Sequence, residues 1–475
     1  MKFSVPLLLL LVMMTACSSY SPDLPELEIP STWKEPVRSE ICFNQEKNRF
    51  WEYFNDPLLN ALEEEAIAAN SDIKIAIYRI IQASSIVSSE YAERMPHVNL
   101  AANFMNDETL LNPRSFGSPT KKLKRVQQQE YSIVADFSYE LDLWGKLKAQ
   151  EESARSRWQA TQWEYEFVFQ TVVTEVAIRY FTLRTLGEEI HFLTRAIALR
   201  KDAVFLNQCR VEAGADPEVD LSRAKLELAL AEVDIEEAKC QYAIQEHALA
   251  TLLGKPASCW SLELGLLPTN IPPVPAVMPA EILMRRADVQ QSLALLAADR
   301  SNVDVALRNY FPSFSLTTAA GLASPFLSHL FEWEGRYWSY IFDLFAPLYD
   351  GGKRNANLLE AKAQFAENFN DYVKTVNCAF QDVEDALADI NYLHLQYEGQ
   401  KRALDAASDT AYLSNEQFNT GLISYLLVQD AENTLLDVER KAISLKGEKI
   451  LAWVRLMKAL GIQSRECISA IPANM

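Results

Sequence analysis

Glycine is scarce in this chain, with 14 residues among 475. Because glycine supplies the positive φ angles of tight turns, so few of them argue against a fold of many short strands and favour long helices. Basic residues are also in the minority: 45 Lys and Arg stand against 64 Asp and Glu, which gives a formal net charge of −19. Nucleic acid is therefore disfavoured as a partner, since phosphate binding needs a basic surface.

Catalytic and metal-binding patterns are also missing from the sequence. The five histidines are scattered, and no Cys-x-x-Cys pair, Gly-rich phosphate loop or nucleophile elbow occurs. We therefore expect no enzyme activity, no metal and no bound cofactor. The cysteines leave one question open, because an exported chain can form a disulfide between any two of Cys42, Cys209, Cys240, Cys259, Cys378 and Cys467.

The first residues resemble a bacterial lipoprotein signal. Lys2 precedes the apolar run Val5–Met14, which is too short to span a bilayer. The run leads into Thr15-Ala16-Cys17, and small residues before a cysteine resemble a lipobox, so we expect a covalent lipid on Cys17. No Asp follows Cys17, which favours the outer over the inner membrane. An ordinary signal peptide with a chance cysteine is the alternative.

Internal repetition is the main organising feature of the chain. Three glycines of the first half recur 207 residues later: Gly145 as Gly352, Gly214 as Gly421 and Gly254 as Gly461. Prolines gather between the halves, which is a linker composition. We expect six segments: a signal peptide 1–16, a lipidated N-terminal segment 17–56, repeat one 57–264, a Pro-rich linker 265–278, repeat two 279–463 and a tail 464–475.

Each repeat predicts the same order of elements: a helix, two strands, a very long helix, a turn at glycine and a returning helix. The first helices are expected over about 57–94 and 279–309, each ending just before a proline. Apolar residues at helical spacing, without any proline, predict the long helices over 146–212 and 353–419. Helices of about 100 Å need packing neighbours along their length, as in coiled coils.

Four segments alternate apolar and polar residues with the period of a β-strand, namely 97–105, 131–141, 313–320 and 338–345. Their length and aromatic content are typical of transmembrane barrel strands, although a soluble sandwich sheet alternates in the same way. After the signal there is no run of 18 apolar residues, so a membrane crossing would have to use strands. Four strands cannot enclose a pore, which predicts that several copies of the chain contribute.

Short motifs occur in a characteristic order along the chain. They are Trp51–Leu59, Leu283–Val289, Phe311-Pro312, Pro347–Gly352 and Lys458–Gly461. Each motif is weak alone. With the duplication, they resemble the TolC-like outer-membrane factors, in particular the NodT/OprM-type lipoprotein branch from drug and metal efflux systems. Ala287 stands where that family usually has a proline.

The resemblance implies an α+β membrane protein in which three copies pool their strands into a 12-stranded barrel, continued by a coiled-coil helical tunnel in the periplasm. It implies a homotrimer in outer-membrane lipid, with a periplasmic adaptor (a membrane fusion protein) and an inner-membrane transporter as partners. The function it implies is a passive duct of a tripartite efflux system for small molecules such as drugs or metals. A trimeric scaffold lipoprotein without transport is the alternative.

Two sets of residues carry functional hypotheses. The turns that end the long helices, at Gly214, Ala215, Gly421 and Leu422, meet the adaptor in similar proteins, although glycine also ends helices for structural reasons alone. Asp202, Asp405 and Asp409 precede these turns, and in a trimer an inward acid becomes a ring that repels anions at a periplasmic gate. Ordinary solvated acids near Arg200, Lys401 or Arg402 are the alternative reading.

A third region is the expected external loop 107–129, where positive charge gathers at Lys121, Lys122, Lys124 and Arg125. We expect a solvated loop that meets lipopolysaccharide phosphates, in preference to a specific receptor site.

Overall fold

The computed structural model describes residues 29–36, 49–111, 124–214, 217–268, 271–273, 279 and 284–461. The chain forms two compact units that each draw on both repeats. The first includes Ile81–Ala160 and Leu293–Asp371, and the second includes Glu26–Ile80, Thr161–Ser292 and Tyr372–Met475. The duplication in the sequence therefore does not correspond to two separately folded halves.

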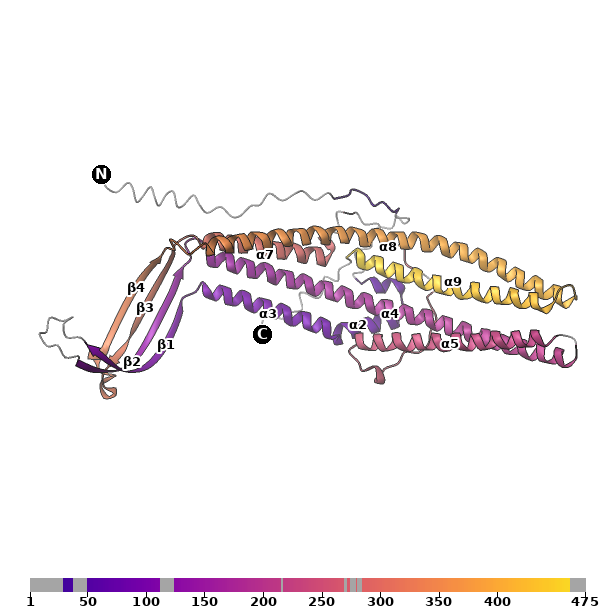
Figure 1. Cartoon of the computed structure of the whole chain (residues 1–475), viewed down its shortest axis with the longest axis horizontal. Helices are drawn as coiled ribbons and strands as arrows, with labels where there is room; N and C mark the ends of the chain where they lie inside the picture. Colours follow the sequence, from indigo (N-terminus) through magenta and orange to yellow (C-terminus); the bar gives the residue numbers. More distant parts are fainter. Residues whose placement is uncertain are drawn as a thin grey trace. The chain divides into compact units, whose positions relative to one another are not determined.

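The first unit contains a four-stranded antiparallel sheet in the order β1-β2-β3-β4 (Figure 1). Its strands are β1 (His97–Leu111), β2 (Lys124–Leu141), β3 (Ser313–Ser324) and β4 (Arg336–Phe345). Each repeat contributes one hairpin, and β2 pairs with β3 across the two repeats. Within the described residues, β1 and β4 each keep an outer edge without a partner strand.

The register gives the sheet one apolar and one polar face. Leu100, Ala135, Ala320 and Trp338 stand opposite one another on neighbouring strands and so share a face. The rows on either side of them add further apolar residues to this face, namely Val98, Phe137, Tyr139, Leu316, Leu322, Tyr340 and Phe342. The intervening positions are mostly polar, including Asn99, Ser132, Asp136, Ser138, Ser315, Ser339 and Asp343. The predicted alternation is thus confirmed on all four strands.

Two strands are longer than the sequence suggested, so the expected loop over 107–129 is wrong at both ends. β1 continues to Leu111 and β2 begins at Lys124, and the two pair along this extension, with Asp107 opposite Gln128. The extension is rich in polar residues, so its composition resembles that of a loop. Its residues nevertheless continue the pairing of β1 with β2. Lys121 and Lys122 lie outside the described residues, whereas Arg125 belongs to β2.

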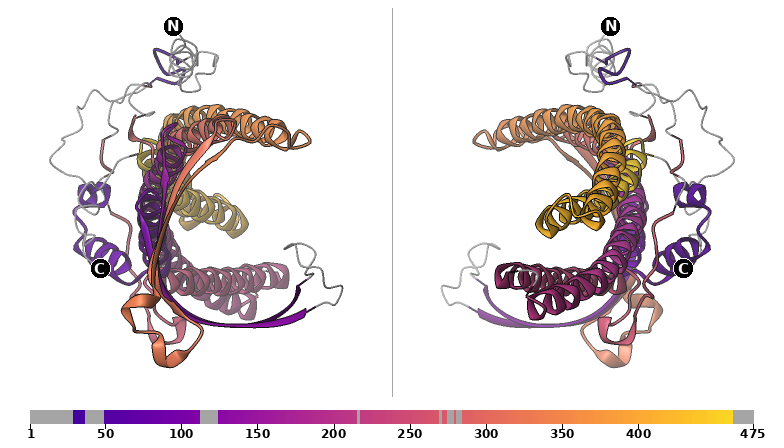
Figure 2. Two further views of the ribbon diagram at one scale, coloured as in Figure 1. Left: turned by 90° about the vertical axis from the view of Figure 1, so that its left-hand side faces the viewer. Right: turned by 90° about the vertical axis from the view of Figure 1, so that its right-hand side faces the viewer.

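Two very long helices, α4 (Lys146–Glu212) and α8 (Lys353–Asn419), follow the hairpins. Each has 67 residues, and both bounds agree with the prediction. The returning helices α5 (Glu218–Leu252) and α9 (Tyr425–Ala459) have 35 residues each. Figure 2 shows α4 with α5 and α8 with α9 as two pairs of neighbouring helices. In the second unit, a core cluster around Phe192 and Ile235 joins α4 to α5, and Leu436 of α9 packs against it.

The single helix predicted over 57–94 is wrong, because two helices occupy it: α2 (Pro57–Ala69) and α3 (Ser71–Glu93). Asn70 separates them. Its side-chain oxygen accepts hydrogen bonds from the N–H groups of Asp72 at 2.8 Å and Ile73 at 3.2 Å, which is an N-cap for α3. Its amide donates to the carbonyl of Leu252 at 2.9 Å, so a contact distant in sequence fixes the break.

The first helix of repeat two is shorter than predicted, because α7 spans Ala287–Arg308. Pro279 and the pair Met284–Arg285 are also helical, and Arg286 interrupts the helix before α7 begins. Among the described helices, none combines the length and the apolar character that a membrane crossing needs.

Candidate functional site

The tips of the two long helices are shaped by glycine. Gly214 and Gly421 have φ angles of 72° and 79°, in the left-handed region, while a Cβ at either position would meet none of the described atoms within 4 Å. Backbone conformation, not crowding, therefore requires glycine. The N–H of Leu422 donates to Gln417 O at 2.9 Å, and the Leu422 side chain is 76% exposed. Ala215 lies outside the described residues.

Aromatic contacts connect the two tips, a feature that the sequence did not suggest. The guanidinium of Arg210, near the end of α4, lies 5.0 Å from the ring centre of Phe418 near the end of α8. Phe418 in turn packs on Tyr425, the first residue of α9, with ring centres 5.2 Å apart. Residues of both repeats therefore meet where their hairpins turn.

The three gate candidates are exposed carboxylates on the long helices. Asp202 lies on α4, and Asp405 and Asp409 lie on α8. Asp202 helps to line a cleft of about 350 Å³ between α4 and α9, together with Phe192, Arg195, Ala196, Ala198, Leu199, Leu436 and Glu439. Neither acid of α8 is among these lining residues. Within one chain, the structure therefore does not gather the three candidates into one site.

Ion pairs connect the returning helix of repeat two to the hairpin of repeat one. Arg440 of α9 binds Glu189 of α4 at 2.7 Å and Asp234 of α5 at 3.2 Å. Lys446 of α9 binds Glu188, the residue before Glu189 on α4, at 3.3 Å. Burial lowers the pKa of Arg440, but its bonds to Glu189 and nearby acids outweigh this and raise it. These partners are more than 200 residues apart in sequence, so no local pattern could have identified them.

Two buried carboxyl groups of the second unit have no hydrogen-bond partner among the described residues: Glu63 on α2 and Glu166 on α4. Glu63 is fully buried, and Glu166 is 3% exposed. Burial raises the pKa of Glu63 well above its usual value and that of Glu166 to about 7. Both carboxyls are thus stabilised in the protonated form at mildly acidic pH, and their positions gave no signal in the sequence.

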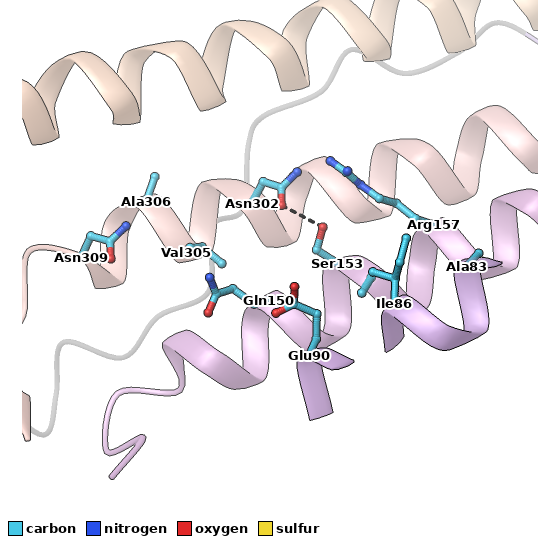
Figure 3. Close-up of a pocket in the computed structure, with 11 residues that line it drawn as sticks. Ala83, Ile86, Glu90, Gln150, Ser153, Arg157, Asn302, Val305, Ala306 and Asn309 are labelled. Carbon is cyan, nitrogen blue, oxygen red and sulfur yellow. Dashed lines mark hydrogen bonds between the residues drawn. The ribbon is translucent and has the colours of Figure 1, made fainter. Parts of the chain in front are cut away.

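A polar network in the first unit surrounds Asp299 on α7. Asn302 and Asn368 donate to its carboxylate, and Arg157 approaches it at 4.0 Å. Ser153 of α4 donates to Asn302 at 2.8 Å, as Figure 3 shows. The adjoining groove of about 360 Å³ lies between α3, α4 and α7 and is lined by Ala83, Ile86, Glu90, Gln150, Ser153, Ala154, Arg157, Asn302, Val305, Ala306 and Asn309. The network connects α4, α7 and α8 beside this groove.

The opening motif has a structural role in the second unit. Asp56 caps α2 by accepting from the N–H groups of Leu58 and Leu59, and the hydroxyl of Tyr180 donates to its other oxygen. Burial, reinforced by Asp56, raises the pKa of Tyr180 to about 12. Trp51 is almost fully buried.

The second-half motif also holds helices in place. Arg286 donates to Asp288 and to Asp382 of α8 at 2.9 Å, and approaches the carbonyl of Ala459 at the end of α9. Because Arg286 is mostly buried, these bonds compensate the desolvation of its charge. Both motifs therefore mark packing positions.

The described residues contain no group of three His, Cys, Asp or Glu that could hold a metal ion. Cys209, Cys240, Cys259 and Cys378 are free thiols. Cys42, Cys467 and the expected lipidation site Cys17 lie outside the described residues.

A model of the family described as outer membrane efflux protein matches residues 62–255 and 278–462 of the chain. The chain belongs to this family. It is an outer-membrane channel component of an efflux system, and hence a transport protein. One matched stretch lies in each half of the chain, and each half contains one helix of 67 residues.

Curated relatives match along most of their length. The probable outer membrane lipoprotein SilC of Salmonella typhimurium is 26% identical over 454 residues, which cover 94% of this chain and 96% of the relative. The solvent efflux pump outer membrane protein SrpC of Pseudomonas putida is 28% identical over 422 residues, which cover 86% of each chain.

Solved structures share the fold. The outer-membrane channel OprN superposes with a TM-score of 0.84 at 24% identity, covering 92% of this chain and 98% of that one. The CmeC outer membrane channel of Campylobacter jejuni gives a TM-score of 0.83 at 23% identity, covering 94% of this chain and 95% of that one.

Proposed function

We propose that three copies of this chain assemble into a passive duct that carries small molecules through the outer membrane and continues into the periplasm as a helical tunnel. The observation that carries this proposal is the four-stranded sheet, with its apolar face and with two edges that have no partner strand in the part of the chain that the structure describes. Lipid cannot satisfy the backbone donors and acceptors of a free edge, so β4 of one copy is proposed to pair with β1 of the next.

The number of copies follows from the size of a closed barrel. Two copies would supply eight strands, and the interior of a barrel of about eight strands is filled by its own side chains. Three copies are the smallest number that leaves a water-filled interior. The apolar face would then meet lipid, and the polar face with Asp136, Ser138 and Asp343 would line the duct.

The partners in this proposal are a periplasmic adaptor and an inner-membrane transporter, because nothing in the described residues suggests a source of energy. The adaptor is proposed to dock at Gly214, Ala215, Gly421 and Leu422. Docking there fits the exposed Leu422 and the contact between the two tips. A lipid on Cys17 is proposed as the sole covalent group, which would hold the N-terminal segment at the membrane.

Relatives named for solvent efflux and cation efflux suggest small solutes as cargo. We propose that the partner transporter selects them and that the duct is permissive.

The test is reconstitution of the purified protein. We expect native mass spectrometry in detergent to give three chains per particle, and planar bilayers to show stepwise ionic current. A stable monomer that gives no current would overturn the proposal and would favour a periplasmic scaffold.

A further inference from the structure

The loop between β3 and β4 exposes a patch of large apolar side chains at the end of the sheet farthest from the helix junctions. Phe326, Leu327, Phe331 and Trp333 are 60–76% exposed. Single exposed apolar residues are common on protein surfaces, but four within eight residues form a patch that calls for a partner.

The loop is held in a defined shape. Two 3-10 turns, η4 (Leu327–His329) and η5 (Trp333–Gly335), order its backbone. Between them Leu330 is only 4% exposed and anchors the loop. At Gly335 the loop lies directly on β3, since a Cβ there would be 2.9 Å from the carbonyl oxygen of Ala323. The four apolar side chains are therefore presented outward while the loop itself is packed.

Several polar groups of the loop are paired within the loop itself. The N–H groups of His329, Leu330, Glu332 and Gly335 each donate to a carbonyl three residues earlier, at 3.1–3.3 Å. His329 Nδ1 and Glu332 Oε2 are 3.0 Å apart, and Arg336 donates to Trp333 O at 3.0 Å. Backbone groups that enter lipid need internal partners, and these bonds supply them at the two 3-10 turns.

The patch also continues the apolar face of the sheet. Arg336 occupies the same row of β4 as Trp338, Tyr340 and Phe342. The rings of Trp338 and Tyr340 are stacked, and those of Tyr340 and Phe342 meet in a T-shaped contact. The guanidinium of Arg336 lies 4.0 Å from the ring centre of Trp333, so the indole extends this aromatic row past the end of the strand. Tryptophan and tyrosine concentrate at the level of lipid head groups.

We infer that this loop is a lipid-contacting surface, with Phe326, Leu327 and Phe331 inserted among the acyl chains of the outer leaflet and Trp333 at their boundary with the head groups. The inference rests on the proposed function, because only a sheet that crosses the membrane brings its far end to that leaflet. His329, Glu332 and Arg336 then lie at the level of the head groups, where their charges remain hydrated. The loop acts as an anchor that opposes movement of the sheet along the membrane normal.

Spin labels on single cysteines test the inference in reconstituted bilayers. Cysteines other than Cys17 are replaced by serine. A nitroxide is placed by Phe331→Cys in the patch, by Glu334→Cys at an exposed acid of the loop, or by Phe342→Cys on the sheet. Power saturation measures how often each label collides with oxygen, which concentrates in lipid, and with a nickel chelate, which stays in water. We expect the ratio of oxygen to nickel accessibility to exceed one at positions 331 and 342 and to fall below one at position 334.

The outcomes separate the two proposals. If position 331 is accessible to nickel while position 342 is accessible to oxygen, the lipid contact of the loop is overturned and the proposed channel stands. Protection of position 331 from both reagents would also overturn it, since another protein surface would then cover the patch. Water at position 342 would instead refute the membrane-spanning sheet. If the label disturbs the loop, tryptophan fluorescence provides the same readout. Brominated lipids should then quench the fluorescence of Trp333→Phe less than that of the parent.

Discussion

Glu166 illustrates at the residue scale how a buried carboxyl makes stability depend on pH. In the unfolded chain it ionises near its ordinary pKa of 4.5, whereas in the folded chain burial raises its pKa to about 7. Between these values the folded state keeps a proton that the unfolded state has lost, so stability falls as pH rises through this window. The loss amounts to roughly 3 kcal/mol once pH exceeds the folded pKa.

We predict that Glu166→Gln removes this loss. The variant should match the parent near pH 4.5 and be more stable than it at pH 8, by thermal unfolding followed by circular dichroism. Glu367→Gln, at an exposed position of α8, is the matched control and should show no such divergence. Parallel curves for Glu166→Gln and the parent across this range would contradict the buried neutral carboxyl.

Gly399 within α8 and Gly421 in the turn after it make opposite predictions for the same substitution. Gly421 has a φ of 79°, so Gly421→Ala should destabilise the tip by about 1 kcal/mol, the usual cost of a side chain in the left-handed region. Gly399 is helical with open space around it, so Gly399→Ala should stabilise the protein by about 0.5–1 kcal/mol. The melting temperatures of the two variants should therefore shift in opposite directions, and a shift in the same direction would be incompatible with these backbone assignments.

At the scale of elements, a short N-terminal segment is held on α8. The N–H groups of Lys34 and Glu35 donate to the carboxylate of Glu384 at 2.7 and 3.1 Å. Asn391 donates to Pro36 O at 3.0 Å, and Trp33 packs edge-on against Phe380. These contacts fix the chain between the proposed lipid anchor and the first helix.

We predict that Glu384→Ala releases this segment, because one side chain accepts from two successive N–H groups. Trypsin should then cut after Lys34 faster than in the parent, as measured by mass spectrometry of the digest. Asp385→Ala changes the neighbouring exposed acid and is the control that should leave cleavage unchanged. Equal rates in all three proteins would mean that the clamp does not hold the segment.

The hairpin tips carry a second prediction at this scale. Leu422 is largely exposed, so Leu422→Trp should fold and assemble normally while abolishing export in cells, and a bulky residue at Ala215 should do the same. The measurement is drug or metal sensitivity of a strain that depends on this channel, with protein level and assembly checked in parallel. Leu413→Trp, at another exposed position of α8, serves as a control expected to retain export. Normal export in the tip variants would rule out docking at these positions.

Elements with strong local signals could be predicted, and those set by distant contacts could not. Glycines at both ends and the absence of proline gave α4 and α8 their correct bounds. The break at Asn70 was missed because it depends on a contact with Leu252, 182 residues away. The strand extensions were missed because their polar residues imitate a loop, although pairing between β1 and β2 continues through them.

The candidate site divides in the same way. The tips follow from single glycines whose φ angles are positive, so the sequence located them. The contacts between hairpins, such as Arg440 with Glu189 and Asp234, join residues from different repeats and depend on packing that no local pattern encodes. The open edges of β1 and β4 show why the single chain is insufficient for the proposed duct.

For the whole molecule, symmetry would multiply the effect of a single acid. If three copies surround one axis and Asp409 faces inward, each duct carries three such carboxylates near its periplasmic end, where a narrow passage concentrates their field. Asp409→Asn should then lower the preference for cations and reduce single-channel conductance at low salt, whereas Asp409→Glu should retain both. Screening shortens the reach of these charges to about 8 Å at physiological ionic strength, so the difference should shrink as salt is raised. Asp405→Asn, one turn earlier on α8, tests how strongly the effect depends on the position of the carboxylate along the axis of the duct. If Asp409→Asn conducts with unchanged selectivity at every salt concentration, Asp409 is an ordinary solvated acid and the proposed ring of carboxylates does not exist.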